Sequence, residues 1–344
     1  MIHRLTTDAH GVLQQSVLPR FQRSVRKTNC TIVDIDPNDQ RQVMLGFGAA
    51  FTDASCYLFN QLPADSRAEL FNELFSPAGL ALSVCRTTVG QSDYGRECYS
   101  YDDVPDDRNL DHFSITYDTA YIIPMIRQAK SVNPDLFLFS SPWSPPGWMK
   151  TSGSMCGGWM RQEYLDVYAQ YYVRYLCEYA KAGITINALT TQNEPESGQE
   201  GLMPACLWHP DYEMAFVRDH LSPLLRRQGL AVKIWLNDHN YSHWVRAKWM
   251  LDDPRVRAVV DGVAFHPYTG EPEMMSRLCE AHPGTRLYWT EGGPSMARGK
   301  VDTEWCVWGT RMTGAIRNGC RSFTGWNLAL DENGKPNIGP FNCR

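Results

Sequence analysis

Residues 136–140 read Leu-Phe-Leu-Phe-Ser, a continuous apolar run of the kind that is buried on both faces of a parallel sheet. After a loop, residues 163–182 carry apolar side chains at helical spacing, and Gly183 follows them. This pattern predicts an amphipathic helix that stops at a glycine. A buried strand followed by a helix that covers it is the unit from which parallel α/β folds are built.

The same alternation continues in both directions along the chain. Strands are predicted over residues 44–51, 81–86, 136–140, 184–191, 231–236, 262–266, 286–290 and 322–327. Helices are predicted over residues 64–75, 117–130, 163–182, 211–228, 243–251, 273–281 and 304–317. Strict alternation of eight strands with seven helices predicts an α/β fold, and we favour a (β/α)8 TIM barrel. An open doubly wound sheet is the alternative, but Gly46-Phe-Gly48 lacks the third glycine of its phosphate turn.

Composition and charge fit one large domain of this kind. The 344 residues are 43% hydrophobic, and a chain of this length buries roughly three quarters of its unfolded surface. A net charge of −5 leaves no basic excess for nucleic acid or for anionic membranes. The apolar runs fall short of the ~20 residues that a membrane span requires.

The first 15 residues are polar and lack the apolar stretch of a secretory signal. We therefore expect a cytoplasmic protein if this start is authentic, and otherwise a secreted protein whose signal has been removed. The 11 cysteines show no CxxC pair, which favours reduced thiols over a disulfide framework. HExxH, zinc-type cysteine spacing, the Gly-x-Ser-x-Gly elbow and the P-loop are all absent from the sequence.

Polar and aromatic residues lie near the ends of nearly all the predicted strands. Reactive groups of (β/α)8 barrels cluster at the carboxyl ends of the strands and in the loops that follow them. The sequence therefore predicts an active site at this rim of the barrel. The residues concerned are Asp93, Trp143, Asn193, Glu194, Asp238, His239, His266, Tyr268, Glu291, Trp326 and Asn327.

Two carboxylates stand out among these residues. Glu194 and Glu291 are 97 positions apart (291 − 194), yet both follow strands that end at the same rim. Cleavage of a glycosidic bond requires one proton donor and one nucleophile or base on either side of the bond. The sequence does not fix the distance between the two groups, on which the stereochemical outcome depends.

Each of these residues, taken singly, also has a structural interpretation. A lone glutamate at a strand end is usually a neighbour of a helix cap or a solvated loop residue. Glu196 and Glu200 compete for the same role, but they lie beyond the strand end and are expected to face solvent. His266 is more often a structural hydrogen-bonding group, and Trp143 and Trp326 are more often part of a core.

The motifs taken together resemble glycoside hydrolase family 30, whose best-known members are the lysosomal acid β-glucosidases (glucosylceramidases). The resemblance runs from about Gln42 to the end of the chain, with the motifs in family order. The motifs are Leu45-Gly-Phe-Gly-Ala-Ala-Phe-Thr-Asp53, Ser141-Pro-Trp143-Ser-Pro-Pro-Gly-Trp148-Met-Lys150, Thr191-Gln-Asn193-Glu194-Pro195, His266-Pro-Tyr268, Thr290-Glu291-Gly292 and Gly325-Trp326-Asn327-Leu-Ala-Leu330.

The resemblance implies a retaining double displacement on β-glycosides, without metal or cofactor. Glu194 matches the acid/base and Glu291 the nucleophile of the family. We expect the negative charge of Glu291 to keep Glu194 protonated. Asn193 matches the residue that holds the 2-hydroxyl of the sugar.

The resemblance also implies the remaining substrate-binding residues. Asp93 and Trp143 match residues that bind the far hydroxyls of the glucose ring, and Trp326 resembles the platform under the sugar. His266 and Tyr268 match groups near the nucleophile, where Tyr268 could orient Glu291 by a hydrogen bond.

For the substrate, the resemblance favours a β-glucosidase of the glucosylceramidase type, and Asp93 favours glucosides over xylosides. A β-1,6-glucanase with the same chemistry is the first alternative. A catalytically inactive, sugar-binding remnant is the second.

Family members continue beyond the match to Asn337-Ile-Gly-Pro-Phe341 into an eighth helix and a β-sandwich domain. We therefore divide the chain into residues 1–40, a segment related to that sandwich, and residues 41–344, a barrel that ends after its eighth strand. The missing helix would leave an apolar face of the first and last strands open. An open face of this kind predicts a homodimer or poor solubility.

Overall fold

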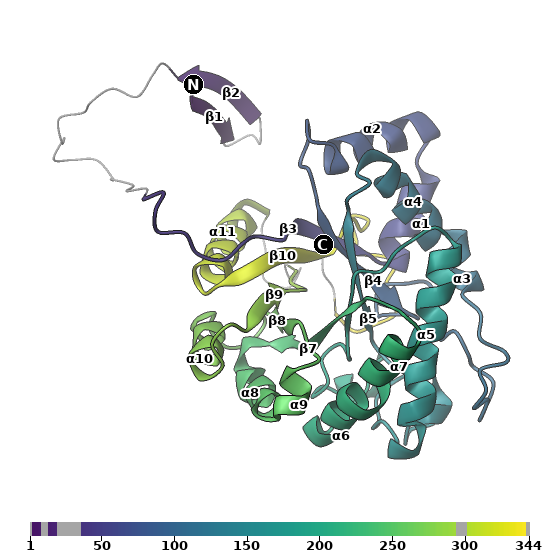
Figure 1. The fold of residues 1–344 in the computed structure, drawn as a ribbon. Coiled ribbons are helices and arrows are strands. Elements are labelled where there is room, and N and C mark those ends of the chain that lie inside the picture. Colours follow the sequence, from purple (N-terminus) through teal and green to yellow (C-terminus); the bar gives the residue numbers. More distant parts are fainter. Residues whose placement is uncertain (1, 8–12, 19–35, 294–300, 342–344) are drawn as a thin grey trace. The chain divides into compact units, whose positions relative to one another are not determined.

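A computed structural model describes residues 2–7, 13–18, 36–293 and 301–341 (Figure 1). The chain divides into two compact units, one up to Arg41 and the other from Gln42 onward. In the first unit, strands β1 (Ile2–Thr7) and β2 (Leu13–Leu18) form an antiparallel pair. The second unit carries the candidate site and is described below.

Eight parallel strands of the second unit close into a barrel in the order β10-β3-β4-β5-β6-β7-β8-β9. This arrangement confirms the predicted TIM barrel. Each strand overlaps the range expected from the sequence. The strands are β3 (Gly46–Phe51), β4 (Val84–Val89), β5 (Phe137–Pro142), β6 (Ala188–Thr190), β7 (Lys233–Asn240), β8 (Gly262–His266), β9 (Arg286–Trp289) and β10 (Cys320–Asn327).

Helices surround the strands, with α10 and α11 on one side of the barrel and α4 and α5 on the other (Figure 1). They are α1 (Asp53–Gln61), α2 (Ala64–Phe75), α3 (Thr116–Ala120), α4 (Ile122–Val132), α5 (Leu165–Lys181), α6 (Pro210–Ala215), α7 (Ser222–Arg227), α8 (Trp244–Asp252), α9 (Pro254–Arg257), α10 (Glu273–Ala281) and α11 (Val301–Arg317). A π-helical turn, Phe216–Leu221, joins α6 to α7. Short 3-10 turns cover Gly147–Met149, Gln162–Tyr164, Gln199–Gly201 and Tyr241–His243. None of the helices in the described ranges is long and apolar enough to cross a membrane.

Two local differences from the sequence prediction have a physical cause. Helix α1 was not predicted; it begins after Thr52, whose hydroxyl caps it by accepting a hydrogen bond from the backbone N–H of Ser55. The helix predicted over residues 117–130 is broken at Tyr121 into α3 and α4. Pro124 explains the break, because it has no N–H to bond the carbonyl group four residues earlier.

The lower half of the barrel interior is filled by apolar side chains from alternate positions of its strands. The buried cluster consists of Val84, Phe139, Ala188, Trp235, Ala264 and Tyr288. The rings of Trp235 and Tyr288 stack with their centroids 3.9 Å apart, so the barrel is closed beneath the site. A larger apolar core lies between the strands and the surrounding helices.

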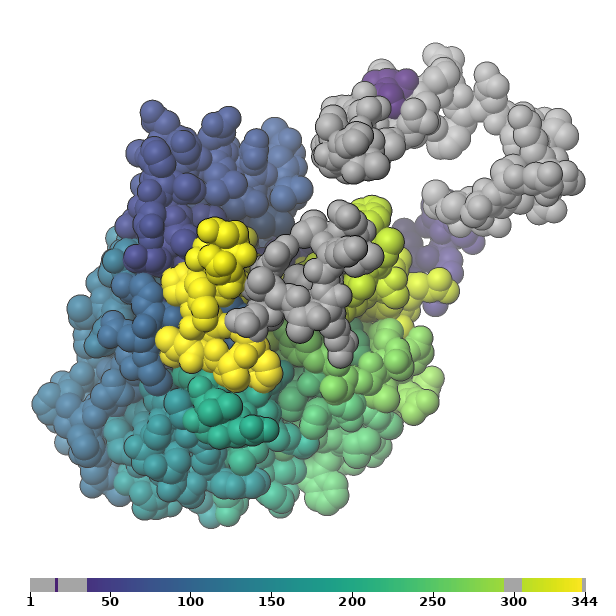
Figure 2. Space-filling model, turned by 180° about the vertical axis from the view of Figure 1, so that it is seen from behind, coloured from purple at the N-terminus to yellow at the C-terminus, as the bar shows by residue number. Residues whose placement is uncertain are grey.

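No helix follows β10 among residues 328–341. This segment instead crosses the carboxyl ends of the first strands: the N–H of Leu328 donates to the carbonyl of Ala50, and that of Ile338 donates to the carbonyl of Asp93. Figure 2 shows the segment, in yellow, on the surface of the molecule. Eight strands with seven helical connections agree with the prediction.

The first barrel strand, β3, and the segment that leads into it leave apolar side chains in solvent. Val43 is 73% exposed and Phe47 is 40% exposed. We predict that Phe47→Ser reduces self-association of the chain, because it removes apolar area from this surface. Analytical ultracentrifugation over a range of concentrations measures the effect. Val245→Ser, at a position on α8 with 56% exposure, is the control. A wild-type chain that stays monomeric throughout the range contradicts the prediction.

Candidate active site

The floor of the barrel is the buried apolar cluster described above, from Val84 on β4 to Tyr288 on β9. A polar layer lies directly above it. Because side chains of a strand alternate between its two faces, the residues two positions after the floor residues also point inward. These residues are Arg86, Ser141, Thr190, His266 and Thr290, all with 0% exposure. The carboxyl ends of five strands therefore converge on one buried polar network.

Strand β7 enters this layer through an irregularity. Its pairing with β8 shifts between Leu236 and His239, and Asn237 and Asp238 have left-handed φ values of 74° and 43°. The carboxylate of Asp238 consequently reaches the layer and accepts hydrogen bonds from the hydroxyls of Thr190 and Thr290, each at 2.6 Å. Burial is the largest single influence and would raise the pKa of Asp238, but the charge of the Arg86 guanidinium, together with the hydrogen bonds from His266 and Thr190, holds this pKa well below its usual range.

Arg86 is the centre of the network. Its guanidinium donates to Asp238 Oδ2 at 2.7 Å and to Glu291 Oε2 at 2.6 Å, so that one cation pairs with two carboxylates. It also donates to Asn193 Oδ1 at 2.9 Å, and its carbon lies 4.6 Å from the ring centroid of Trp143. Arg86 is not among the residues predicted from the sequence. An arginine inside a predicted buried strand was the available signal, because arginine is almost never fully buried unless it is paired.

His266 joins the two candidate catalytic carboxylates. Its Nδ1 is 3.2 Å from Glu194 Oε1 and 4.0 Å from Glu291 Oε1, and its Nε2 is 3.0 Å from Asp238 Oδ1. Burial would lower the pKa of His266, but the charge of Glu291 and the hydrogen bonds to Asp238 and Glu194 raise it to about 9. The imidazole is therefore protonated at neutral pH and donates from both nitrogens.

This protonation state changes the expected role of Glu194 in the resting site. Burial is the largest single influence and raises its pKa, but the hydrogen bond from His266 and the charges of the neighbouring histidines together hold the pKa below its usual value. The expectation that repulsion from Glu291 keeps Glu194 protonated is therefore wrong. The proton resides on Nδ1 of His266, one hydrogen bond away from Glu194.

Glu194, His266 and Glu291 are the only three metal-ligand side chains within the described residues whose ligand atoms all lie within 4.8 Å of one another. A metal ion would require the lone pair of Nδ1. In this structure that nitrogen lies 3.2 Å from Glu194 Oε1, within hydrogen-bonding distance.

The backbone at Glu194 is strained. Its φ is 48°, in the left-handed region that residues with a Cβ rarely occupy. Its N–H donates to the carbonyl of Asp238 at 3.0 Å, and Gln199 Nε2 donates to Glu194 Oε2 at 2.8 Å. Strain of this kind persists only where surrounding contacts fix the conformation, and it is concentrated at functional sites.

Two neighbours set the orientation of polar groups beside the carboxylates. Because Arg86 binds Oδ1 of Asn193, the Nδ2 group of this amide remains as a donor. The hydroxyl of Tyr268 donates to Glu291 Oε1 at 2.9 Å, while Arg86 binds the other oxygen. Both oxygens of Glu291 are therefore held by donors.

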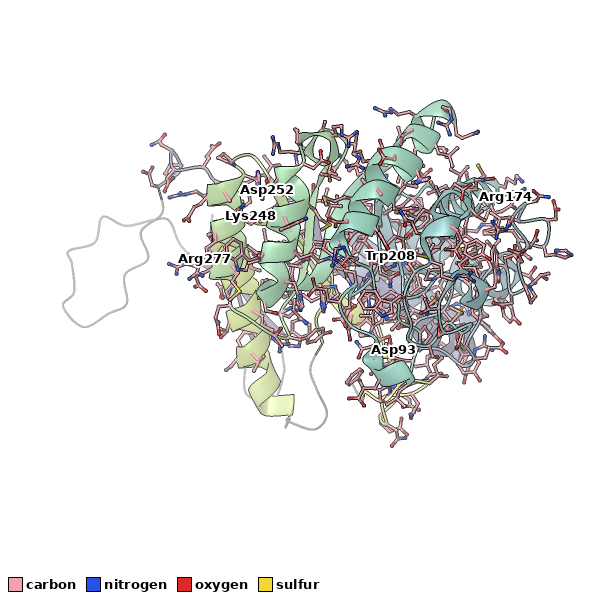
Figure 3. All side chains as sticks on the ribbon, turned by 90° about the horizontal axis from the view of Figure 1, so that it is seen from below. Asp93, Arg174, Trp208, Lys248, Asp252 and Arg277 are labelled. Carbon is pink, nitrogen blue, oxygen red and sulfur yellow. The ribbon has the colours of Figure 1, made fainter. Side chains whose placement is uncertain are left out.

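The remaining predicted residues form one wall of the site. Trp143 and Trp326 are both buried, and their rings stack with centroids 4.8 Å apart. Asp93 Oδ1 is buried without a hydrogen-bond partner among the described residues. Burial, followed by repulsion from Glu291, raises the pKa of Asp93 well above its usual value. Figure 3 places Asp93 away from Arg174 and Arg277, which mark opposite sides of the molecule.

The competing acidic residues remain outside this network. Glu196 is exposed and pairs with His243 at 2.6 Å and with Arg246 at 3.1 Å. Glu200 is also exposed. The structure therefore brings together the two catalytic and six substrate-binding candidates that the resemblance implied. It adds Arg86 beneath them, and it gives contacts to Asp238, which the sequence indicated only as a residue at a strand end.

A (β/α)8 barrel with two carboxylates around a protonated histidine is an architecture suited to glycosidic cleavage. Residues 44–340 match the glycosyl hydrolase family 30 TIM-barrel domain, and the chain belongs to this family. The resemblance inferred from the motifs is thereby confirmed.

Relatives with different substrates in their names match the chain at similar identity. An "Endo-1,6-beta-D-glucanase" of Neurospora crassa is 33% identical over 89% of this chain and 64% of its own length. A "Putative glucosylceramidase 4" of Caenorhabditis elegans is 32% identical over 97% of this chain and 68% of its own length. The chain thus spans about two thirds of the length of these curated relatives.

Solved structures agree with this placement. The crystal structure of SrfJ from Salmonella typhimurium has a TM-score of 0.90 and 29% identity, over 99% of this chain and 77% of that one. The endo-β1,6-glucanase BT3312 has a TM-score of 0.84 and 28% identity, over 90% of this chain and 71% of that one.

We predict that Arg86→Met lowers the free energy of unfolding by about 3–5 kcal/mol, because it leaves the buried carboxylate of Asp238 without its cation. Urea unfolding measures the loss. Adding Asp238→Asn to this variant should restore part of it. Lys248→Met, which breaks an exposed pair with Asp252 on α8 (Figure 3), is the control and should change stability by about 0.5 kcal/mol or less. Equal losses of stability in Arg86→Met and Lys248→Met would contradict the prediction that Arg86 is needed to pair a buried carboxylate.

We predict that His266 makes the stability of the protein depend on pH. Its folded pKa of about 9 lies above the ordinary value of 6.5, so its contribution is fully present below pH 6.5 and is lost as pH rises through 9. The full contribution is about 3 kcal/mol. Urea unfolding of the wild type and His266→Gln should therefore give a difference in stability that shrinks between these two pH values. A difference that is independent of pH would show that His266 is not protonated in the fold.

Proposed function

We propose that this chain is a retaining β-glycoside hydrolase in which Glu291 is the nucleophile and Glu194 is the acid/base. The observation that carries the proposal is the separation of the two carboxylates, whose nearest oxygens lie within 4.8 Å of each other. Retaining enzymes have carboxyl groups about 5–5.5 Å apart, whereas inverting enzymes need about 6.5–9.5 Å to admit a water molecule. The short separation favours retention.

In the first step, a Glu291 oxygen forms a bond to the anomeric carbon as the bond from this carbon to the leaving oxygen breaks. The leaving oxygen receives a proton from Glu194, which takes it from Nδ1 of His266 along the 3.2 Å contact. Esterification removes the charge of Glu291, and this charge is one of the interactions that hold the proton on His266. Nucleophilic attack and proton release therefore support each other.

In the second step, Glu194 acts as a base. It takes a proton from water as the water oxygen attacks the anomeric carbon and the bond to Glu291 breaks, and it returns this proton to Nδ1 of His266 along the same contact, which restores the resting site. The hydrogen bond from Gln199 to Oε2 keeps the Glu194 carboxylate oriented while its Oε1 faces His266. Two inversions at the same carbon give net retention.

The residues proposed to bind the sugar offer hydrogen-bonding groups that the described part of the protein does not use. The Nδ2 group of Asn193 is available for the 2-hydroxyl, where a hydrogen bond strengthens in the transition state. The unpartnered Oδ1 of Asp93 suits a hydroxyl on the far side of the ring. Trp143 and Trp326 supply the adjoining aromatic surface.

For the substrate, we propose a β-1,6-linked glucan as the first candidate. The described side chains near Glu194 are polar, among them Gln199, His243 and Glu196, and they suit a hydroxylated leaving group. Endo-1,6-β-glucanases occur among both the curated relatives and the solved structures. Glucosylceramide, which the sequence alone favours, stays the second candidate because a relative named for it aligns with 97% of the chain.

We predict that a 2-fluoro-glucoside labels Glu291 and that peptide mapping locates the label there. Glu291→Gln should lower kcat on a nitrophenyl β-glucoside by at least about 10³-fold, because no ester can form. Glu200→Gln, the same change at an exposed position, is the control.

Comparison of the reducing sugar released from β-1,6-glucan and from glucosylceramide in detergent micelles decides between the substrates. Label on another residue, or full turnover by Glu291→Gln, would overturn the assignment of the nucleophile.

A further inference from the structure

A second cleft lies outside the catalytic network. It has a volume of about 700 Å3. One wall belongs to the connection from β5 to α5, and the other belongs to the start of α6. Its main lining residues are Thr151, Trp159, Arg161, Glu163, Asp211 and Tyr212.

Trp159 is presented to solvent by a well-bonded turn. Its N–H donates to Thr151 Oγ1 and its carbonyl accepts from the N–H of Thr151, both at 2.9 Å. Gly157 and Gly158, with φ values of 59° and 79°, supply left-handed conformations that other residues adopt at a cost. The indole remains 47% exposed although the next residue, Met160, is 3% exposed. A large aromatic side chain held in solvent on a fixed backbone is preorganised for a ligand.

The cleft opens at the same end of the barrel as the catalytic residues. Both walls follow carboxyl ends of neighbouring strands, which is where the active site of a (β/α)8 barrel lies. Trp208, which precedes the start of α6, donates its backbone N–H to the carbonyl of Pro195 at 2.8 Å. Pro195 follows Glu194, so the wall of the cleft is bonded to the catalytic loop. Figure 3 shows Trp208 among the packed side chains of the interior.

The chemistry of the lining suits a neutral, hydroxylated ligand. Arg161 pairs with Glu163 at 2.5 Å, so this wall carries no net charge that would attract a polyanion. Asp211 is 3.4 Å from His209 and also accepts a hydrogen bond from the indole of Trp249, itself 58% exposed. Exposed rings flanked by paired carboxylate and guanidinium groups match the apolar faces and the hydroxyls of sugar rings.

We propose that this cleft is a secondary binding site for a β-1,6-glucan chain, in which a sugar ring stacks on Trp159. Arg161, Glu163 and Asp211 bind its hydroxyls. The identity of the glucan rests on the proposed function, whereas the site itself does not depend on turnover. One part of a glucan polymer is held in this cleft on the rim of the barrel while another part of the same polymer occupies the catalytic pocket.

Affinity electrophoresis in native gels that contain soluble β-1,6-glucan tests the proposal. Trp159→Ala should reduce the retardation of the protein, because loss of a stacked ring weakens binding by about 2- to 10-fold. Trp305→Ala, at another indole with 75% exposure, is the matched control and should be retarded like the wild type. Trp159→Phe should recover part of the retardation, since it keeps a ring.

Turnover of a nitrophenyl β-glucoside separates this proposal from the catalytic one. Trp159→Ala should leave kcat/KM for this small substrate unchanged and raise KM for the polymer. Retardation that depends on Trp159 in a chain without turnover would support the secondary site and count against the proposed function. The proposal is overturned if the wild type is not retarded, if Trp159→Ala is retarded equally, or if Trp159→Ala loses activity on the small substrate.

Discussion

The buried guanidinium of Arg86, shared between Asp238 and Glu291, is the interaction on which the rest of the site depends. Removing a charged group from water costs several kcal/mol, and only complete pairing offsets this cost. Here the cation has two carboxylates within 2.7 Å and further acceptors on neighbouring strands. The arrangement ties β4 to β5, β6, β7 and β9 at one level. The same contacts that satisfy the arginine therefore fix the positions of Glu291 and Asn193, the proposed nucleophile and the proposed ligand of the sugar 2-hydroxyl.

Charge balance explains why His266 belongs to this layer. In the resting site, Arg86 and His266 carry two positive charges, and Asp238, Glu194 and Glu291 carry three negative ones, a net charge of −1. In the proposed first step, Glu291 becomes a neutral ester and His266 loses its proton to the leaving group through Glu194. The net charge is still −1, because one charge of each sign disappears. A buried site in a low-dielectric environment can pass through this step without accumulating charge.

The sequence predicts the barrel and the site residues that follow the strand ends. It does not predict the buried layer beneath them, where side chains from several strands contact one another. Glu194, Glu291 and Tyr268 are found because they follow apolar runs, and strand ends meet at one rim. Arg86 lies inside a strand, and the carboxylate of Asp238 reaches the layer only through the irregularity of β7. The protonation of Glu194 also depends on His266, whose pKa is set by residues on three other elements. A local sequence pattern carries no information about contacts between side chains of distant strands, and these contacts set the pKa values in the site.

The irregularity of β7 has a further consequence for Glu194, the proposed acid/base. Glu194 and Asp238 both have left-handed backbone conformations, with φ values of 48° and 43°. They are bonded to each other, because the N–H of Glu194 donates to the carbonyl of Asp238. The strained turn after β6 therefore takes its position from the strained segment of β7. Since Asp238 also binds His266 and Arg86, one residue positions the backbone of Glu194, the imidazole beside it and the guanidinium that holds Glu291. In the proposed mechanism these are the acid/base, its proton donor and the cation that holds the nucleophile. A distortion of β7 would displace all three together, and this coupling explains how the two strained conformations persist in a buried layer.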